Sequence, residues 1–278
     1  MSQKANRVRS VAVVTATNGS EHLVRCLESV QSQTFPGLVH LVVVDGAEAL
    51  PTVARQIELV PPTKHRREVI ALPDRTGQGG MNGYRIYAAA PFLFNADVIV
   101  LLDDDNWYDH NHVESCVETI SELNVEWCWS LRRICSVSGT TIIDDDCDSL
   151  GAWRRAASYR GDADCLDPIF QRHYATHPFL VDTSCYAIRR EVMIQHGSAM
   201  LHPYWGDSLL ACALLQHVSG ANTGLRTVNY RLRPAVERQV TEYFMGGNAE
   251  HLHRFNNLRP WLVRQRFDAL SKILAPKG

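Results

Sequence analysis

Three consecutive aspartates, Asp103 to Asp105, are the residues of this sequence whose types and spacing most directly suggest chemistry. They come directly after Asp97–Leu102, the most hydrophobic run of the chain. Carboxylates this close repel one another, and partly desolvated carboxylates cost several kcal/mol unless cations neutralise them. A hard divalent cation, Mn²⁺ or Mg²⁺, would bind their oxygens and keep open positions for phosphate. The alternative interpretation is a solvated acidic turn that, with Asn106, caps a helix expected from about Asp109.

A second acidic run, Asp144 to Asp146 with Asp148, has a similar composition but a different setting. It follows Thr140–Ile143, a shorter and less hydrophobic run that is expected to pair in a hairpin. We therefore expect an exposed loop here, or a feature of an acceptor-binding side.

Several other side chains leave two interpretations open. Arg231, Arg233 and Arg238 could bind a diphosphate or an anionic acceptor, or they could form a solvated basic face. Trp107, Trp153 and Trp205 could stack on a sugar ring, although packing in the core or at its rim is the default. Among the 12 histidines, the pairs 173/177 and 251/253 have a spacing that could bind a cation, although a surface or hydrogen-bonded position is the default for each. The eight cysteines show no CxxC spacing and are expected as buried free thiols.

The chain before the triplet alternates between short apolar runs and helical patterns. Four runs are expected as strands: Arg9–Thr15, His40–Val44, Arg67–Leu72 and Asp97–Leu102. Helices are expected from Ser20 to Pro36-Gly37 and, after a Gly-rich segment at 74–82, through Tyr84–Ala89. This alternation predicts an α/β fold with a mostly parallel, Rossmann-like sheet flanked by helices. Ligands bind beyond the carboxyl ends of such strands, where Thr15–Thr17, Asp45-Gly46 and the triplet all fall.

The second half of the chain has a mixed pattern. Strands are expected at 125–134 and 139–143 around a turn, at 179–189 and at 226–232, with a helix at 207–217. We expect one catalytic domain over 1–232, with a nucleotide-sugar half at about 9–110 and an acceptor half at about 111–232. The amphipathic residues 233–278 are expected as a helical extension.

These pieces, in this order, resemble glycosyltransferase family 2 and the wider GT-A nucleotide-sugar transferases over about Val11 to Tyr230. The matching pieces are Val11–Asn18, Leu27–Phe35, Val42–Gly46, Thr76–Asn82 and Leu102–Asn106. The resemblance implies a GT-A fold and a hexosyltransferase that moves a sugar from a nucleotide diphosphate to an acceptor hydroxyl, with Mn²⁺ or Mg²⁺ at a DXD-type motif. A UDP-sugar is expected ahead of a GDP-sugar, and the acceptor would be a glycan, a lipid-linked molecule or a small molecule.

The resemblance also implies roles for individual residues. Asp45 would hydrogen-bond the base, and the backbone of Thr15, Ala16 and Thr17 would line the nucleoside pocket. Arg75 would face the base or a phosphate. The remaining donor-binding residues would be Asn82, Asp103 and Asp104, and Asp105 would bind the metal directly.

In this family, a later acidic residue at the start of a helix acts as the general base, and Asp207 is the candidate. It lies in Trp205-Gly206-Asp207-Ser208, just before the helical run Leu209–Leu215. Gly206 stands where the family often has a first acidic residue. A carboxylate within hydrogen-bond reach of an acceptor hydroxyl can remove its proton, which suits an inverting transfer. Asp is also a favoured N-cap residue, so a capping role is the alternative.

Three other functions stay open. One is a retaining transferase of the same fold. A second is a sugar-nucleotide nucleotidyltransferase, although Thr15–Gly19 has one glycine and no nearby lysine, unlike the Gly-rich, basic loop usual in that class. The third is a non-catalytic nucleotide-sugar-binding module.

Composition limits the partners and the location. The formal net charge of −2 gives no overall basic field that would draw the chain to nucleic acid. The residues 1–9 lack the apolar stretch of a signal peptide, and the apolar run at 96–102 is too short to cross a bilayer. We therefore expect no transmembrane segment and a cytoplasmic protein, either free or peripheral at the inner face of the membrane.

Overall fold

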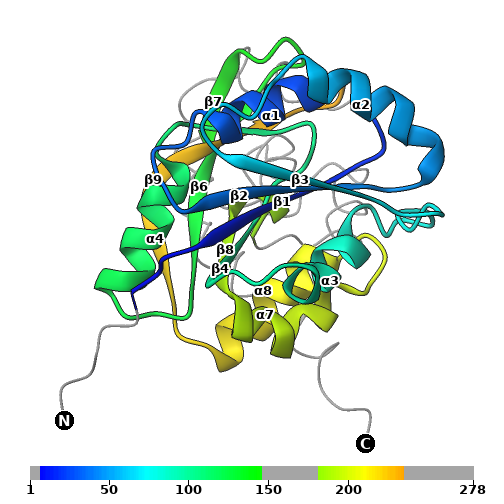
Figure 1. The fold of residues 1–278 in the computed structure, drawn as a ribbon. Helices are drawn as coiled ribbons and strands as arrows, with labels where there is room; N and C mark the ends of the chain where they lie inside the picture. The colour runs from blue at the N-terminus through cyan, green and yellow to red at the C-terminus, as the bar shows by residue number, and fades with distance from the viewer. Residues whose placement is uncertain (1–6, 146–180, 235–278) are drawn as a thin grey trace, which may run out of the picture.

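A single mixed sheet with helices on both faces forms the centre of the molecule (Figure 1). The computed structural model describes residues 7–145 and 181–234. Within these ranges the strand order is β3-β2-β1-β4-β8-β6-β9-β5, with β7 paired to β6. The strands are β1 (Val11–Thr17), β2 (Leu38–Val44), β3 (Arg66–Ala71), β4 (Val98–Leu101), β5 (Trp107–Tyr108), β6 (Trp127–Cys135), β7 (Thr141–Asp145), β8 (Tyr186–Arg189) and β9 (Gly220–Arg231).

The helices form two layers around this sheet (Figure 1). The α-helices are α1 (Leu23–Gln31), α2 (Leu50–Glu58), α3 (Tyr84–Leu93), α4 (His112–Glu122), α7 (Arg190–His196) and α8 (Gly206–His217). The 3-10 turns are η1 (Ala47–Ala49), η3 (Thr183–Cys185) and η4 (Gly197–Met200). Helices α1 and α2 lie over one face of the sheet, while α3, α7 and α8 gather under the other.

Strands β3, β2, β1 and β4 run parallel, as the sequence predicts. The apolar, β-branched residues of β2, β1 and β4 are buried on both faces, so Val11–Val14, Leu41–Val44 and Val98–Leu101 form the centre of the core. Parallel strands covered by helices on both faces require such continuous apolar runs. Consequently the carboxyl ends of β1, β2 and β4 meet at one edge of the sheet.

The second half of the chain extends the same sheet with strands of both directions. β8 pairs antiparallel with β4 on one side and with β6 on the other. β6 and β7 form the predicted hairpin, and Gly139 takes the positive φ of 86° that its turn requires. β9 runs parallel to β6 and pairs with the short strand β5. The sheet is therefore continuous through both halves of the chain.

The structure differs from the sequence-based expectation in several elements. In the described part of the strand expected at 179–189, residues 186–189 form β8, whereas Asp182 accepts the Ser184 backbone N–H and the chain bends into η3 before it. Helix α2 was not predicted from its pattern, although Pro51 stands in its first turn. Helix α7 was also not predicted, and β9 begins six residues earlier, at Gly220.

Three further expectations concern the cysteines, a membrane span and the C-terminal residues. The six described cysteines are free and buried, as expected. No helix in the described ranges is long and apolar enough to span a bilayer. The extension expected at 233–278 lies outside the described residues apart from 233 and 234.

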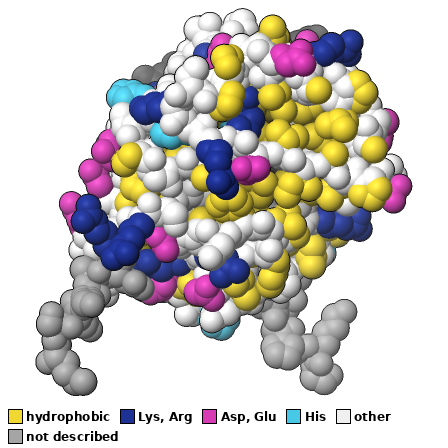
Figure 2. Space-filling model, in the orientation of Figure 1, with side chains coloured by type: hydrophobic (Ala, Val, Ile, Leu, Met, Phe, Trp, Pro, Cys, Tyr) yellow, Lys and Arg dark blue, Asp and Glu magenta, His cyan; other side chains and the backbone are white. Residues whose placement is uncertain are grey.

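Apolar side chains also reach the surface at one edge of the sheet. In Figure 2, hydrophobic side chains gather over the side of the molecule that carries β3 and α3 in Figure 1. The large exposed apolar residues of these two elements are Val69, Phe92 and Leu93. This edge is remote in the sheet order from β6 and β9.

Candidate active site at the carboxyl edge of the sheet

The polar residues that follow β1, β2 and β4 lie together, as predicted. The Thr17 hydroxyl donates to Oδ2 of Asp104 at 2.6 Å and so joins the ends of β1 and β4. The Asp45 backbone N–H donates to the Thr17 carbonyl at 2.7 Å, which joins the ends of β1 and β2. Thr15 lies deeper, where its buried hydroxyl contacts His40 Nε2 at 3.0 Å. The segment from Thr15 to Thr17 is thus the carboxyl end of β1, and it contacts the ends of both neighbouring strands.

Asp45 holds the loop that follows β3. Its buried carboxylate accepts the Thr76 N–H at 2.6 Å, the Thr76 hydroxyl at 2.8 Å and the Gly77 N–H at 2.9 Å. A Cβ on Gly77 would lie 2.3 Å from the Asn82 carbonyl oxygen, so only glycine fits there. Asn82 itself takes a left-handed φ of 48° at the end of this loop. Asp45, Gly77 and Asn82 therefore fix one compact loop beside the strand ends.

Two predicted donor residues border the same loop. Arg75 is exposed at its start, and its Nε lies 3.8 Å from a Glu48 carboxylate oxygen. Ala16 is half-buried and faces Gly83, where an added Cβ would come within 2.9 Å of the Ala16 methyl. The structure brings both residues to the edge that Asp45 and the triplet share.

The triplet is half-buried, and each carboxylate has a different setting. Asp103 accepts the Tyr87 hydroxyl at 2.8 Å, and its backbone N–H donates to Ser184 Oγ at 3.1 Å. Burial raises the pKa of Asp103 well above its usual range, and the Asp182 charge adds to this shift. Burial raises the pKa of Asp104 to about 6. Burial also raises the pKa of Asp105, against the opposing charge of Arg233. For each of the three carboxylates, burial therefore outweighs the neighbouring groups that favour the charged form.

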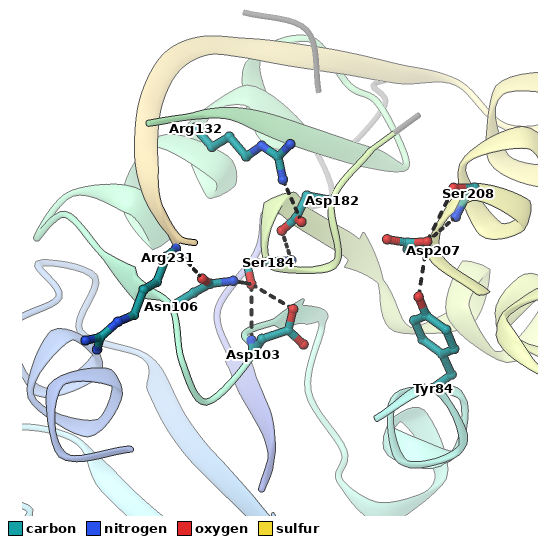
Figure 3. Close-up of polar contacts among 9 residues, drawn as sticks. All are labelled: Tyr84, Asp103, Asn106, Arg132, Asp182, Ser184, Asp207, Ser208 and Arg231. Carbon is teal, nitrogen blue, oxygen red and sulfur yellow. Dashed lines mark hydrogen bonds and ion pairs between the residues drawn. The ribbon is translucent and has the colours of Figure 1, made fainter. Parts of the chain in front are cut away.

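Asn106 ties the triplet to the second half of the sheet rather than capping a helix. Its side-chain amide donates to Ser184 Oγ at 2.9 Å, and its Oδ1 accepts the Arg231 backbone N–H at 2.9 Å (Figure 3). Helix α4 begins after Asn111, which makes no side-chain capping bond. The interpretation of the triplet as a helix cap assisted by Asn106 is therefore wrong.

Asp207 is buried in the first turn of α8, with 4% of its surface exposed. Its Oδ1 accepts the Ser208 N–H at 2.7 Å and the Tyr84 hydroxyl at 3.3 Å (Figure 3). Burial, followed by the charge of Asp182, raises the pKa of Asp207 to about 7. The N-cap residue of α8 is Trp205 and not Asp207, so the alternative interpretation of Asp207 as the N-cap is wrong. The carboxylate still satisfies one of the first-turn N–H groups that a helix leaves unpaired.

Gly206 explains why this chain lacks an acidic residue before Asp207. A Cβ at this position would lie 2.4 Å from the Met200 carbonyl oxygen and 2.6 Å from the Tyr84 ring. The backbone has no room for a side chain, so Asp207 is the single carboxylate at the start of α8.

A buried ion pair lies between the triplet and Asp207, and it was not predicted from the sequence. Nη1 of Arg132 on β6 donates to Oδ2 of Asp182 at 2.8 Å (Figure 3). The guanidinium also stacks 4.4 Å over the Tyr230 ring. Only 1% of the Arg132 side chain is exposed. An arginine inside a largely apolar strand was the available signal, because a buried charge needs a partner, although the adjacent Arg133 carries the same signal.

The remaining predicted residues lie elsewhere or outside the description. Asp144 is exposed on β7, and its carboxylate lies 4.0 Å from Arg133 Nε and 3.7 Å from Arg226 Nε. Arg231 is the last residue of β9 and Arg233 follows two positions later, and both charges act on Asp105. Trp107 stacks under Arg25, and Trp205 stacks on His202. Asp146, Asp148, Trp153, Arg238 and the histidine pairs at 173/177 and 251/253 lie outside the described residues.

The triplet has the donor chemistry of a hard cation site. Its oxygens are carboxylates from consecutive residues, and burial disfavours their charge. In the described ranges, no three His, Cys, Asp or Glu side chains converge as a ready cation cage. Mg²⁺ and Mn²⁺ sites at phosphates commonly use one or two carboxylates, together with phosphate and water oxygens. The residues present therefore fit such a partial ligand set.

Comparison with known proteins gives a family match and a fold match. The family model for "Glycosyl transferase family 2" matches residues 11–193, well over half of the chain. No curated protein sequence matches.

Solved glycosyltransferase structures share the fold. S. aureus TarS superposes with a TM-score of 0.53 at 12% identity, over 88% of this chain and 41% of that one. TarS 1-349 in complex with UDP-GlcNAc gives 0.53 at 11% identity, over 88% and 69%. The mannosyltransferase PcManGT from Pyrobaculum calidifontis, in complex with GDP-Man and Mn²⁺, gives 0.53 at 13% identity, over 98% and 76%. The predicted GT-A fold is confirmed, and this chain spans less than half of the longer TarS chain.

Proposed function

This chain belongs to glycosyl transferase family 2, and we propose that it moves a sugar from a nucleotide diphosphate to an acceptor hydroxyl at the carboxyl edge of its sheet. The observation that carries the proposal is the pairing of two carboxylate centres there. The triplet and the buried Asp207 lie on either side of the segment 182–186 (Figure 3). Burial raises the pKa of Tyr84, and the charges of Asp207 and Asp103 both add to this shift, which supports the proposal that the two centres are close neighbours.

The donor nucleotide would occupy the part of the edge between β1, β2 and the 75–82 loop. Related folds bind UDP-GlcNAc and GDP-Man, which supports a nucleotide sugar here. Asp45 would read the base through Oδ2, which accepts one hydrogen bond from the described residues, that of the Gly77 N–H, and has a further lone pair. The backbone of Thr15–Thr17 would line the nucleoside, with Arg75 and Asn82 at the rim. We propose a UDP-sugar ahead of a GDP-sugar.

The diphosphate would lie at the triplet. Asp105 would bind Mn²⁺ or Mg²⁺ directly, with Asp103 and Asp104 beside it toward the ribose. When bound, the cation would neutralise the negative charge that develops on the leaving diphosphate. The Mn²⁺ in the PcManGT complex supports this choice of cofactor. The positive charges of Arg231 and Arg233 act at the same aspartate and would help to hold the phosphates.

Asp207 would act as the general base in a direct displacement. Its carboxylate would accept the proton of the acceptor hydroxyl while that oxygen bonds to the anomeric carbon. The bond from the anomeric carbon to the diphosphate oxygen breaks in the same step, which inverts the anomeric centre. A base is most effective when its pKa lies near the working pH, and burial places the pKa of Asp207 at about 7.

The acceptor would approach from the side of α8 and could be a glycan, a lipid-linked molecule or a small molecule. We propose that a membrane-bound acceptor would be reached from the water side of the bilayer. We propose that the protein works in the cytoplasm, either free or at the inner face of the membrane.

Thermal unfolding in the presence of nucleotides tests this function. UDP, GDP, ADP and CDP are compared, each with and without Mn²⁺, at concentrations far above their dissociation constants. A ligand that binds only the folded state raises the Tm by mass action. We expect selective stabilisation by one diphosphate, UDP first, that requires Mn²⁺. Equal Tm values with every nucleotide, with and without the metal, would contradict the proposal.

A further inference from the structure

The ion pair between Arg132 and Asp182 is buried, and Asp182 begins the segment that contacts both carboxylate centres. Taking two charges out of water costs several kcal/mol per ion, and apolar residues of similar size often give equal stability. The Arg132 guanidinium pairs with the Asp182 carboxylate, and its flat face stacks on the Tyr230 ring. The charge of Asp182 acts on Asp103, Asp207, Tyr84 and Tyr186 alike. The buried Asp182 charge therefore acts on groups of both carboxylate centres.

The segment that Asp182 begins also bonds to both centres. The Asp182 carboxylate accepts the Ser184 N–H at 3.0 Å, and this turn aims Ser184 Oγ at the Asp103 N–H. Two residues later, the Tyr186 hydroxyl donates to the Asp207 carbonyl at 2.6 Å. One short segment therefore connects the end of β4 with the start of α8 (Figure 3).

We propose that Asp182, anchored by Arg132, is a positioning residue that keeps a fixed negative charge and a fixed segment between the triplet and Asp207, and so tunes proton transfer by Asp207. This inference rests on the proposed function of Asp207 as the base. Asp182 itself does not contact the acceptor or the donor in this account.

Besides burial, it is the charge of Asp182, among the described neighbours of Asp207, that raises the pKa of Asp207. In the parts of the chain that the structure describes, Asp207 faces Tyr84 of α3, Tyr186 of β8, Ser208 of its own helix and Asp182. Burial raises the pKa of Tyr84 and that of Tyr186 well above the usual range, so both are neutral at working pH. A nearby negative charge disfavours ionisation of a carboxyl group. Removing the Asp182 charge should therefore let Asp207 ionise at a lower pH.

Asp182→Asn is the direct test, with kcat/KM measured against pH. The acid limb of the profile should move down by about one pH unit, the order that a nearby like charge produces. The single variant leaves Arg132 buried without its counter-charge and could fail to fold. The double variant Arg132→Met with Asp182→Asn removes both charges and should move the limb in the same direction. Glu126→Gln is the matched control, because it breaks the Arg189 ion pair at the other end of β8 and should leave the limb in place.

A second measurement does not need activity. In the ligand-free protein, the folded pKa of Asp207 is raised, so its contribution to stability is fully present below the unfolded value and is lost as pH rises to about 7. The stability difference between Asp207→Asn and the parent should thus grow with pH and level off near pH 7. In the Asp182→Asn background, and in the double-variant background, it should level off about one pH unit lower.

The two measurements separate the inference from the proposed function. A lower levelling pH in both backgrounds supports the inference even where no sugar transfer is detected, and then only the proposed function fails. An unchanged levelling pH overturns the inference, whatever the kinetics show. An acid limb that moves equally in Glu126→Gln also overturns it, because any lost ion pair would then suffice.

Discussion

Asp207 must meet two opposing requirements. A buried carboxyl group resists ionisation, whereas a base has to be ionised to accept a proton. Its hydrogen bonds from Ser208 and Tyr84 favour the ionised form, and burial with the Asp182 charge opposes it. The resulting pKa of about 7 lets Asp207 take up and release a proton near neutral pH.

Replacing Asp207 with Asn tests this residue directly. The amide has nearly the same size, and its oxygen can still accept the Ser208 N–H, so the fold and donor affinity should be retained. Turnover should fall by about 10²–10⁴-fold, the usual contribution of a general base. Transfer kinetics are measured beside direct titration of the nucleotide sugar. Undiminished turnover would show that the base lies elsewhere, and a collapse of donor binding would assign Asp207 to the donor site or to folding.

Individual residues differ in how far the sequence could predict them. The triplet and Asp45 were located because each follows a buried strand in an alternating α/β pattern. Arg132 could be recognised as a buried charge, but the sequence offers 30 acidic residues as partners. Asp182 lies 50 positions away, and only the antiparallel placement of β8 between β4 and β6 brings it near Arg132.

At the scale of elements, the start of α8 packs closely because Gly206 has no side chain. Gly206 packs against the Met200 carbonyl and the Tyr84 ring, and this contact carries Asp207 to the end of Tyr84. The family departure at Gly206 was visible in the sequence. Its steric cause was not, because η4 and α3 supply the contacts from distant positions.

Gly206→Ala should therefore damage both stability and catalysis. A Cβ 2.4 Å from a carbonyl oxygen forces the backbone to move, and overpacking of this kind costs about 1–3 kcal/mol. Gly197→Ala is the matched control in the same region, since its Cβ would meet Met193 at an ordinary 3.4 Å. Urea unfolding and kcat are measured for both. If the two variants are equally stable and active, Gly206 does not position Asp207.

At the scale of the whole molecule, the two halves share one sheet. β4 of the nucleotide half pairs with β8, and β5 pairs with β9. Asn106 adds a side-chain link from the triplet to Ser184 and Arg231. The parallel direction of the first four strands followed from the sequence pattern. The order of β8, β6 and β9 did not, because long-range pairing is not encoded in local periodicity.

This continuity predicts that the nucleotide half does not fold alone. A chain that ends at His110 would expose the buried edge of β4 and leave β5 without β9. We expect no cooperative unfolding transition and no nucleotide-dependent stabilisation for this fragment, by circular dichroism and thermal shift. A folded fragment that binds nucleotide would instead establish two separable domains.

The central claim is that the triplet, and Asp105 in particular, is the metal-dependent donor site. Calorimetric titration of UDP with and without Mn²⁺ tests it in the parent, in Asp105→Ala and in Asp144→Ala. Asp144 is the matched control because it is an exposed aspartate of the second acidic run, near Arg133 and Arg226. We predict that Asp105→Ala loses the Mn²⁺-dependent part of the affinity while its fold is retained, and that Asp144→Ala binds as the parent does. Equal Mn²⁺-dependent affinity in all three proteins would contradict the account.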